Sequence, residues 1–229
     1  MFYFDPMYFV FALPPMLLVL WAQAKVKGAY GKYSQIRNMA NASGAQVAHI
    51  LLRSKGLDRI DIEMIGGEMT DHYDPGSKTL RLSEGVYRSP SVAAMGIVAH
   101  EVGHAVQDAA GYLPLKARAA LVPAVNLGST LGYIFFFAGF VIGMSGLVWL
   151  GIAMFSLGVV FALVTLPVEF NASSRALALL KGNGLVSVEE YRGAQDVLSA
   201  AALTYVAAVA QALGNLLYFV WLALGRRDE

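Results

Sequence analysis

The chain has 229 residues, a length that allows one or two domains. Hydrophobic residues make up 57% of it and charged residues only 14%, whereas soluble domains carry about 25% charge, so the composition favours an integral membrane protein. The net charge of +1, with no basic patch, argues against a nucleic-acid partner, and the absence of cysteine excludes disulfides and thiolate metal ligands.

The first predicted element is an apolar run from residue 7 to residue 24. Lys25 and Lys27 follow this run, whereas a secretory signal peptide carries its positive charge before the apolar stretch. We therefore expect an uncleaved transmembrane anchor. Pro14 and Pro15 are expected to kink or break it, because proline cannot donate a helical hydrogen bond.

Residues 25–118 have the polarity of a soluble domain. Ser43 as an N-cap and Gly56 as a stop signal predict a helix between them, with Ile50 among its inward-facing residues. His49 lies on the same helix, and we interpret it as an ordinary helix histidine with no metal role.

Three short extended segments are predicted next, at residues 60–65, 68–73 and 78–82. The first alternates apolar and polar residues, and the other two flank the turn sequence Asp74-Pro75-Gly76-Ser77. These patterns predict a small antiparallel sheet immediately before the next helix.

Ser91 is the predicted N-cap of a helix over residues 92–108, which carries His100, Glu101 and His104. At 3.6 residues per turn, the two imidazoles lie on one helix face and can bind one divalent cation. Glu101 stands beside them, where it can take a proton from water. The alternative is two unrelated core histidines, but burying such groups among apolar neighbours without a partner is costly.

Two apolar stretches at residues 121–141 and 147–167 each have the length of a bilayer span. The segment from 121 to 167 contains no charged residue or histidine, which argues against a transporter with an ion relay. Two glycine pairs spaced four residues apart could allow close helix contact: Gly128 with Gly132, and Gly139 with Gly143.

A polar helix is expected from Glu169 to Lys181, ending near Gly182. Ser187 and Glu190 have the form of a capping box for the next helix. Its continuation over residues 199–224 is apolar and is interpreted as a fourth span.

The predicted fold is therefore a mainly α integral membrane protein with about four transmembrane helices and a small α+β domain. Positive charges near the span ends lie on the side of the metal helix, and the other side has only Arg226 and Arg227. The positive-inside rule then predicts a cytoplasmic metal domain with both termini outside. The predicted domains are a transmembrane anchor at 1–24, a cytoplasmic domain at 25–118, a two-helix transmembrane hairpin at 119–167, helices supplying a third metal ligand at 168–198, and a C-terminal transmembrane helix at 199–229.

A catalytic zinc site needs three protein ligands and an open position, so the two histidines require a partner. Asp108 and Glu169 are the leading candidates. Asp108 lies at the expected helix end, where it could support a ligand or be solvated. We favour Glu169, because it stands among apolar residues at the same membrane face as the metal helix. The alternative role of Glu169 is an interfacial charge that neutralises Arg175.

The order His100-Glu101-x-x-His104 followed by Glu169-x-x-Ala172-Ser173 resembles the gluzincin pattern of HtpX and the CAAX prenyl proteases. The closer resemblance is to the YugP-like membrane zinc metallopeptidases. It covers residues 70–75, the metal helix, and residues 166–179 and 200–207. This resemblance implies a zincin-like protease domain, one zinc ion per chain, His100, His104 and Glu169 as ligands, and Glu101 as the catalytic residue.

One residue departs from the HtpX pattern. Ser173 stands where an aspartate that orients a metal-binding histidine is expected. Because serine is a weaker acceptor in that role, Asn171, Asp108 and a backbone carbonyl are the alternatives for orienting the histidine.

The predicted function is a zinc endopeptidase of the membrane, expected in a bacterial cytoplasmic membrane with its site facing the cytoplasm and with membrane proteins as substrates. Four residues are candidates for stabilising the oxyanion, and the sequence does not rank them: His72, Arg175, Arg192 and Tyr205. For His72 the alternative is hairpin packing. The segment 78–82 is expected to offer a free edge for an extended substrate. The alternative function is a catalytically silent metal-binding scaffold or chaperone, and neither the natural substrate nor the oligomeric state follows from the sequence.

Overall fold

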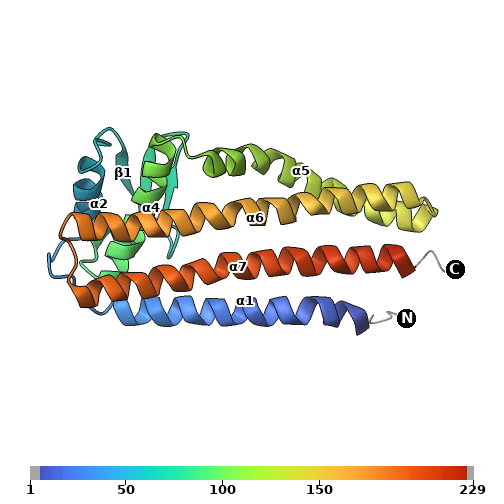
Figure 1. Ribbon diagram of the computed structural model, residues 1–229, viewed down its shortest axis with the longest axis horizontal. Helices are drawn as coiled ribbons and strands as arrows, with labels where there is room; N and C mark the ends of the chain where they lie inside the picture. Colours follow the sequence, from blue (N-terminus) through green and yellow to red (C-terminus); the bar gives the residue numbers. More distant parts are fainter. Residues whose placement is uncertain (1–5, 226–229) are drawn as a thin grey trace. The chain divides into compact units, whose positions relative to one another are not determined.

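The computed structural model describes residues 6–225. Arg226 and Arg227, on which part of the predicted orientation depends, lie outside the described residues. In chain order the elements are α1 (Pro6–Tyr33), α2 (Gly44–Arg53), β1 (Asp61–Ile65), β2 (His72–Asp74), β3 (Thr79–Ser83), α3 (Glu84–Arg88), α4 (Val92–Ala109), α5 (Leu113–Ile142), α6 (Ser145–Gly182) and α7 (Val188–Gly225) (Figure 1).

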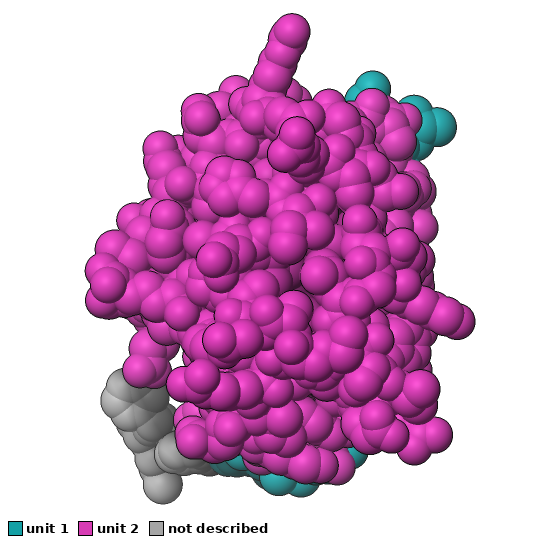
Figure 2. Space-filling view, turned by 90° about the vertical axis from the view of Figure 1, so that its left-hand side faces the viewer, with its two compact units in different colours: residues 1–22, 113–167, 204–229 teal, residues 23–112, 168–203 magenta. Residues whose placement is uncertain are grey.

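Four helices, α1, α5, α6 and α7, are long and apolar enough to cross a membrane. Together with the small sheet of β1, β2 and β3, they confirm the predicted fold class, a mainly α membrane protein with a minor α+β part. The chain divides into two compact units (Figure 2). Among the described residues, unit 1 comprises residues 6–22, 113–167 and 204–225, and unit 2 comprises residues 23–112 and 168–203.

The N-terminal helix differs from the prediction in two ways. α1 continues without interruption through Pro14 and Pro15, and it extends to Tyr33 instead of ending near residue 24. A break at these prolines is therefore wrong, and a kink there stays a prediction. A proline in an apolar spanning helix is tolerated because neighbouring groups satisfy the backbone carbonyl that loses its partner.

The contact of α5 with α6 in unit 1 depends on glycine. Gly128, Gly132 and Gly139 are buried, and a Cβ at Gly139 would lie 2.7 Å from the Leu147 Cβ. The predicted close approach is thus confirmed for these three. Gly143 has another role, because its φ of 82° forms the turn between the two helices.

The sheet of unit 2 has the order β1-β3-β2. β3 pairs antiparallel with β2, as predicted, but it pairs parallel with β1, so the prediction of a wholly antiparallel sheet is wrong. Gly67 and Met69 have positive φ in the segment after β1, which carries the chain to the far side of β3 instead of folding back as a hairpin. The central position of β3 agrees with the burial of Thr79, Leu80, Leu82 and Ser83.

Helix α2 begins as predicted, but the set of residues that it buries differs slightly from the prediction. Ser43 and Gln46 form the capping box at its start. Ile50 is 41% exposed, which contradicts its predicted inward position. Ala48 and Leu52 are buried in its place, because the buried stripe of this helix follows residues 47, 48, 51 and 52.

The helix that carries the two histidines, α4, matches the prediction closely. Ser91 caps it by accepting a hydrogen bond from the Ala94 N–H. Its apolar side, including Met95, Val98 and Val102, is fully buried in the hydrophobic core of unit 2. This burial fixes the rotation of α4 and therefore the direction in which its polar residues point.

The segment of the predicted third ligand is not a separate helix. α6 runs through Pro167 and Glu169 as one helix of 38 residues. α7 likewise continues from the capping box of Ser187 and Glu190 to Gly225. The positions of the predicted domain limits at 118, 167 and 198 remain predictions.

α4 and α6 approach each other closely at Gly103. A Cβ at Gly103 would lie 2.6 Å from the Ala172 carbonyl oxygen, and backbone cannot rotate out of the way as a side chain can. We expect Gly103→Ala to lower the free energy of unfolding by about 1–3 kcal/mol, the usual cost of overpacking. Thermal unfolding of the purified protein in detergent measures this change.

Gly158→Ala in α6 is the matched control. No atom outside its own helical surroundings lies within 4 Å of the added Cβ. Its stability should be unchanged or raised by up to about 1 kcal/mol, the helix propensity that alanine gains over glycine. Equal stability of the two variants would show that α4 and α6 do not approach closely at Gly103.

Candidate metal centre

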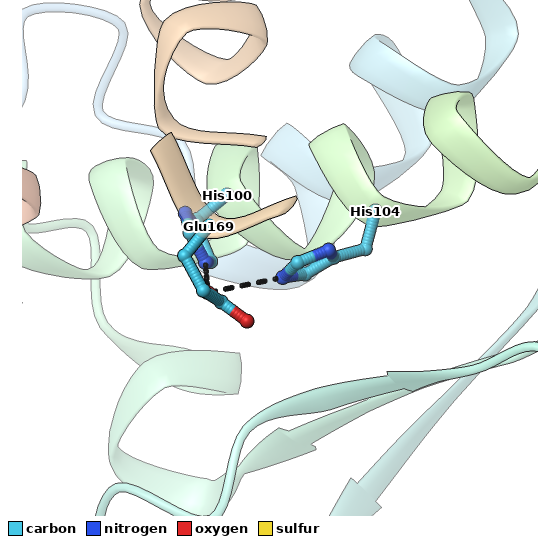
Figure 3. A group of neighbouring side chains, drawn as sticks. All are labelled: His100, His104 and Glu169. Carbon is cyan, nitrogen blue, oxygen red and sulfur yellow. Dashed lines mark hydrogen bonds and ion pairs between the residues drawn. The ribbon is translucent and has the colours of Figure 1, made fainter. Parts of the chain in front are cut away.

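The two histidines of α4 point to the same place. His100 and His104 stand one turn apart on the helix, with ring centroids 4.7 Å apart. Figure 3 shows both rings projecting toward Glu169, which comes from α6. Since the burial of the opposite side of α4 fixes its rotation, this arrangement follows from the helical spacing of the histidines and the packing of the core.

Glu169 brings its carboxylate to both rings. Its Oε2 lies 3.1 Å from His100 Nε2 and 3.5 Å from His104 Nε2, and its side chain is only 3% exposed. A tetrahedral zinc ion with bonds of about 2.0–2.1 Å separates its ligand atoms by about 3.3–3.4 Å. The carboxylate oxygen therefore lies close to this spacing from each imidazole nitrogen, and the ligand atoms of the three residues lie within 4.8 Å of one another, so the group could hold a metal ion.

The chemistry of His104 also fits a cation. Its Nδ1 faces Gln107 Oε1 at 3.0 Å, while its Nε2 faces the Glu169 carboxylate. A neutral imidazole has only one N–H, so it cannot satisfy two acceptors by itself. Burial alone lowers the pKa of His104, but Glu169, Glu101 and Gln107 outweigh burial and raise it. A positive charge, from a proton or a metal ion, is thus favoured at Nε2.

Gln107 is a functional candidate that the sequence analysis missed. It is fully buried, and its Nε2 donates hydrogen bonds to the Val168 carbonyl oxygen at 2.8 Å and to Asn171 Oδ1 at 3.0 Å. The available signal was a polar residue three positions after His104, directly following the apolar Val106. That signal was weak, because the partners on α6 are more than sixty residues away.

Ser173 takes the corresponding place at the other histidine. Its Oγ lies 3.2 Å from His100 Nδ1. Of the three alternatives considered for orienting a histidine, Asn171 acts indirectly, through Gln107. Asp108 contacts Lys78 and the Tyr73 hydroxyl instead.

Glu101 is buried beside the two histidines. Its Oε2 accepts a hydrogen bond of 3.0 Å from the Tyr73 N–H of β2. Burial raises the pKa of the Glu101 carboxyl, and the neighbouring His100 and His104 oppose this effect. The carboxylate is therefore held in place by the backbone and shielded from solvent.

Tyr73 links β2 to the end of α4. Its hydroxyl donates a 2.8 Å hydrogen bond to Asp108, and burial together with this bond raises the pKa of the phenol. Asp108 therefore holds β2 in place through the Tyr73 hydroxyl. It is not part of the group of Glu169 and the two histidines, which corrects its place among the candidate ligands.

The free strand edge also differs from the prediction. β3 is paired on both sides over residues 79–81, so most of the predicted segment 78–82 has no free edge, because the central strand of a sheet uses both rows of backbone groups. The outer edge of β2 is the one next to the site, and there the Tyr73 N–H faces Glu101.

The candidate oxyanion residues of unit 2 have contacts or exposure of their own. His72 is exposed and its Nδ1 is 2.8 Å from the Thr70 carbonyl oxygen. Arg175 donates from Nε to Asn171 Oδ1 at 2.7 Å, and it is thereby connected to His104 through Asn171 and Gln107. Arg192 is exposed on α7. Tyr205 belongs to unit 1, and its role remains a prediction.

Comparison with known proteins identifies the family to which the chain belongs. The family described as "Putative neutral zinc metallopeptidase" matches residues 8–224. The chain belongs to this family. A relative from Bacillus subtilis (strain 168), called "Putative membrane protease YugP", is 43% identical over 224 residues, which cover 97% of this chain and 100% of the relative. No solved structure matches the chain.

Membership of the zinc metallopeptidase family confirms the resemblance found in the sequence. It implies zinc as the cofactor and proteolysis as the activity. Within residues 6–225, His100, His104 and Glu169 form a group that could hold such an ion.

Proposed function

We propose that this metallopeptidase is a zinc-dependent endopeptidase embedded in the membrane, which hydrolyses peptide bonds of membrane or membrane-proximal proteins. In this proposal His100, His104 and Glu169 hold one zinc ion, and Glu101 is the general base. The observation that carries it is the convergence of His100 Nε2, His104 Nε2 and Glu169 Oε2 beside a buried carboxylate.

The bound ion supplies Lewis-acid chemistry, which polarises a carbonyl and lowers the pKa of bound water to about 7. The residues of the chain do the rest. Glu101 is held through Oε2 by the Tyr73 N–H, and its carboxylate takes the proton of the attacking water and passes it to the leaving amine. Ser173 and Gln107 hold the imidazoles by their Nδ1 atoms.

The substrate is proposed to be an extended polypeptide that lies along the outer edge of β2. This edge adjoins Glu101, and pairing through the backbone reads little of the side-chain sequence. The four apolar helices support a membrane location, and the name of the relative points the same way. We further propose the bacterial cytoplasmic membrane, with the metal-bearing segments 25–118 and 168–198 in the cytoplasm, since positive charge gathers there.

The alternative is a catalytically silent scaffold that keeps the metal for stability. A structural zinc site is normally closed by four protein ligands, often cysteines, and this chain has no cysteine. Glu101 also contributes no ligand atom to the described metal group, yet it is buried next to it. Both features favour the peptidase.

Metal removal tests the proposal. Wild-type protein purified in detergent is expected to contain one zinc ion per chain and to cleave casein or a membrane-protein substrate. Dialysis against a chelator should abolish cleavage, and one equivalent of zinc should restore it. Metal content is measured by mass spectrometry, and cleavage by gel. Unchanged cleavage by the metal-free protein would rule out a zinc mechanism.

A further inference from the structure

We propose that Gln107 is a positioning residue for the metal, and that Asn171 and Arg175 hold Gln107 in its working orientation. In this arrangement Gln107 keeps the proton of His104 on Nδ1, so that Nε2 is left with its lone pair toward the cation. The inference deepens the proposed function and rests on it, because it concerns the same metal group.

The orientation of the Gln107 amide is determined by its surroundings. The Val168 backbone carbonyl can only accept a hydrogen bond, so the atom of Gln107 that lies 2.8 Å from it must be the donor, Nε2. The other amide atom, Oε1, therefore faces His104 Nδ1 at 3.0 Å. Since an amide oxygen only accepts, Nδ1 must carry the hydrogen.

The orientation of Asn171 is determined in the same way. The Arg175 guanidinium can only donate, so the Asn171 atom that lies 2.7 Å from its Nε is the acceptor, Oδ1. The same Oδ1 also accepts from Gln107 Nε2 at 3.0 Å. Arg175 and Gln107 thus donate to the same Asn171 oxygen, where the series of hydrogen bonds that runs from His104 Nδ1 through the Gln107 amide ends.

The two histidines are supported by different groups. His104 is held by a fully buried amide that can act only as an acceptor toward Nδ1, whereas His100 is held by the hydroxyl of Ser173, which can donate or accept. The structure therefore assigns the stricter control of protonation to His104. Loss of Gln107 should leave His104 free to place its proton on either nitrogen, and only one of these forms can bind zinc.

The decisive experiment compares Gln107→Met with the wild-type full chain in detergent. Methionine has nearly the same size and no strong acceptor for Nδ1–H. The zinc Kd, measured by competition with a chromophoric chelator, is expected to rise about 10- to 100-fold, the usual effect of removing such a support. In the cobalt-substituted protein, the proton NMR resonance of one imidazole N–H should change while the other stays. Ser173→Ala should alter the other resonance and so assign the two.

A second pair of variants keeps the test valid if Gln107→Met folds poorly. Asn171→Asp retains an acceptor for both Gln107 and Arg175 and should keep the wild-type zinc Kd. Asn171→Leu removes the acceptor and should raise the Kd. Asp108→Asn is the control for general destabilisation. It weakens the ion pair with Lys78 at the residue next to Gln107, and Asp108 contacts neither histidine, so the zinc Kd should stay at the wild-type value.

The outcomes separate the two proposals. Wild-type zinc affinity and unchanged resonances in Gln107→Met would overturn the role of Gln107 while leaving the peptidase proposal intact, as would identical affinities of the two Asn171 variants. A wild-type protein that binds no zinc would overturn the metal site and, with it, this inference. The inference is supported if the zinc Kd rises in Gln107→Met and Asn171→Leu while it stays at the wild-type value in Asn171→Asp.

Discussion

Glu101→Gln is expected to lower kcat by about 10²- to 10⁴-fold, the usual contribution of a general base, while the bound zinc stays at the wild-type level. Glutamine has the shape of glutamate and can still accept the hydrogen bond from the Tyr73 N–H, so the local structure should be retained. It cannot accept a proton from water. Cleavage of casein or a membrane protein and metal analysis of the same preparation give both quantities.

Glu63→Gln is the control for this experiment. Glu63 is an exposed carboxylate on β1 that pairs with Arg81. Its removal should leave both cleavage and zinc content unchanged, because surface ion pairs contribute little to stability. Full cleavage by Glu101→Gln would exclude Glu101 as the base, and loss of zinc in that variant would mean that Glu101 belongs to the metal site itself.

Glu169→Gln is expected to remove most of the bound zinc and, with it, cleavage. The substitution replaces a charged ligand by a neutral amide of equal size between His100 and His104. Loss of a ligand should exceed the 10- to 100-fold effect seen for residues that only support one, so the zinc Kd should rise by more than about 100-fold. Metal analysis after dialysis and chelator competition measure this change.

Glu189→Gln provides the comparison, because Glu189 is an exposed carboxylate at the start of α7. It should bind zinc as the wild type does. If Glu169→Gln kept its full zinc content, a different residue would have to be the third ligand, and the central geometric argument for a peptidase would fail. Partial zinc content with restored cleavage at high zinc concentration would agree with a weakened site.

The parts of the fold that the sequence predicted well are those set by neighbouring residues. The N-caps at Ser43 and Ser91 and the capping box at Ser187 are local contacts, and each is present. The four spans depend only on continuous apolar length. The predicted break at Pro14 and Pro15 is wrong because a soluble-helix rule was applied to an apolar spanning helix.

The sheet shows the opposite case. The first and third extended segments were predicted near their observed positions, whereas β2 shares only residues 72 and 73 with the predicted segment 68–73. The pairing of β1 with β3 depends on which residues become buried together. Alternation of apolar and polar residues indicates a strand without identifying its neighbour. The predicted free edge consequently fell on the central strand, and the site in fact adjoins the outer edge of β2.

The sequence by itself determined the helix of the metal centre and the common face of His100 and His104. It also favoured Glu169 as the third ligand. These follow from a period of 3.6 residues and from the cost of burying a lone carboxylate. Only the tertiary structure decided that Gln107 and Ser173 hold the two rings and that Tyr73 holds Glu101. The reason is physical. The position of a residue along its helix fixes the direction of its side chain, but the hydrogen-bond partners of that side chain come from distant elements, which meet only when the core is packed.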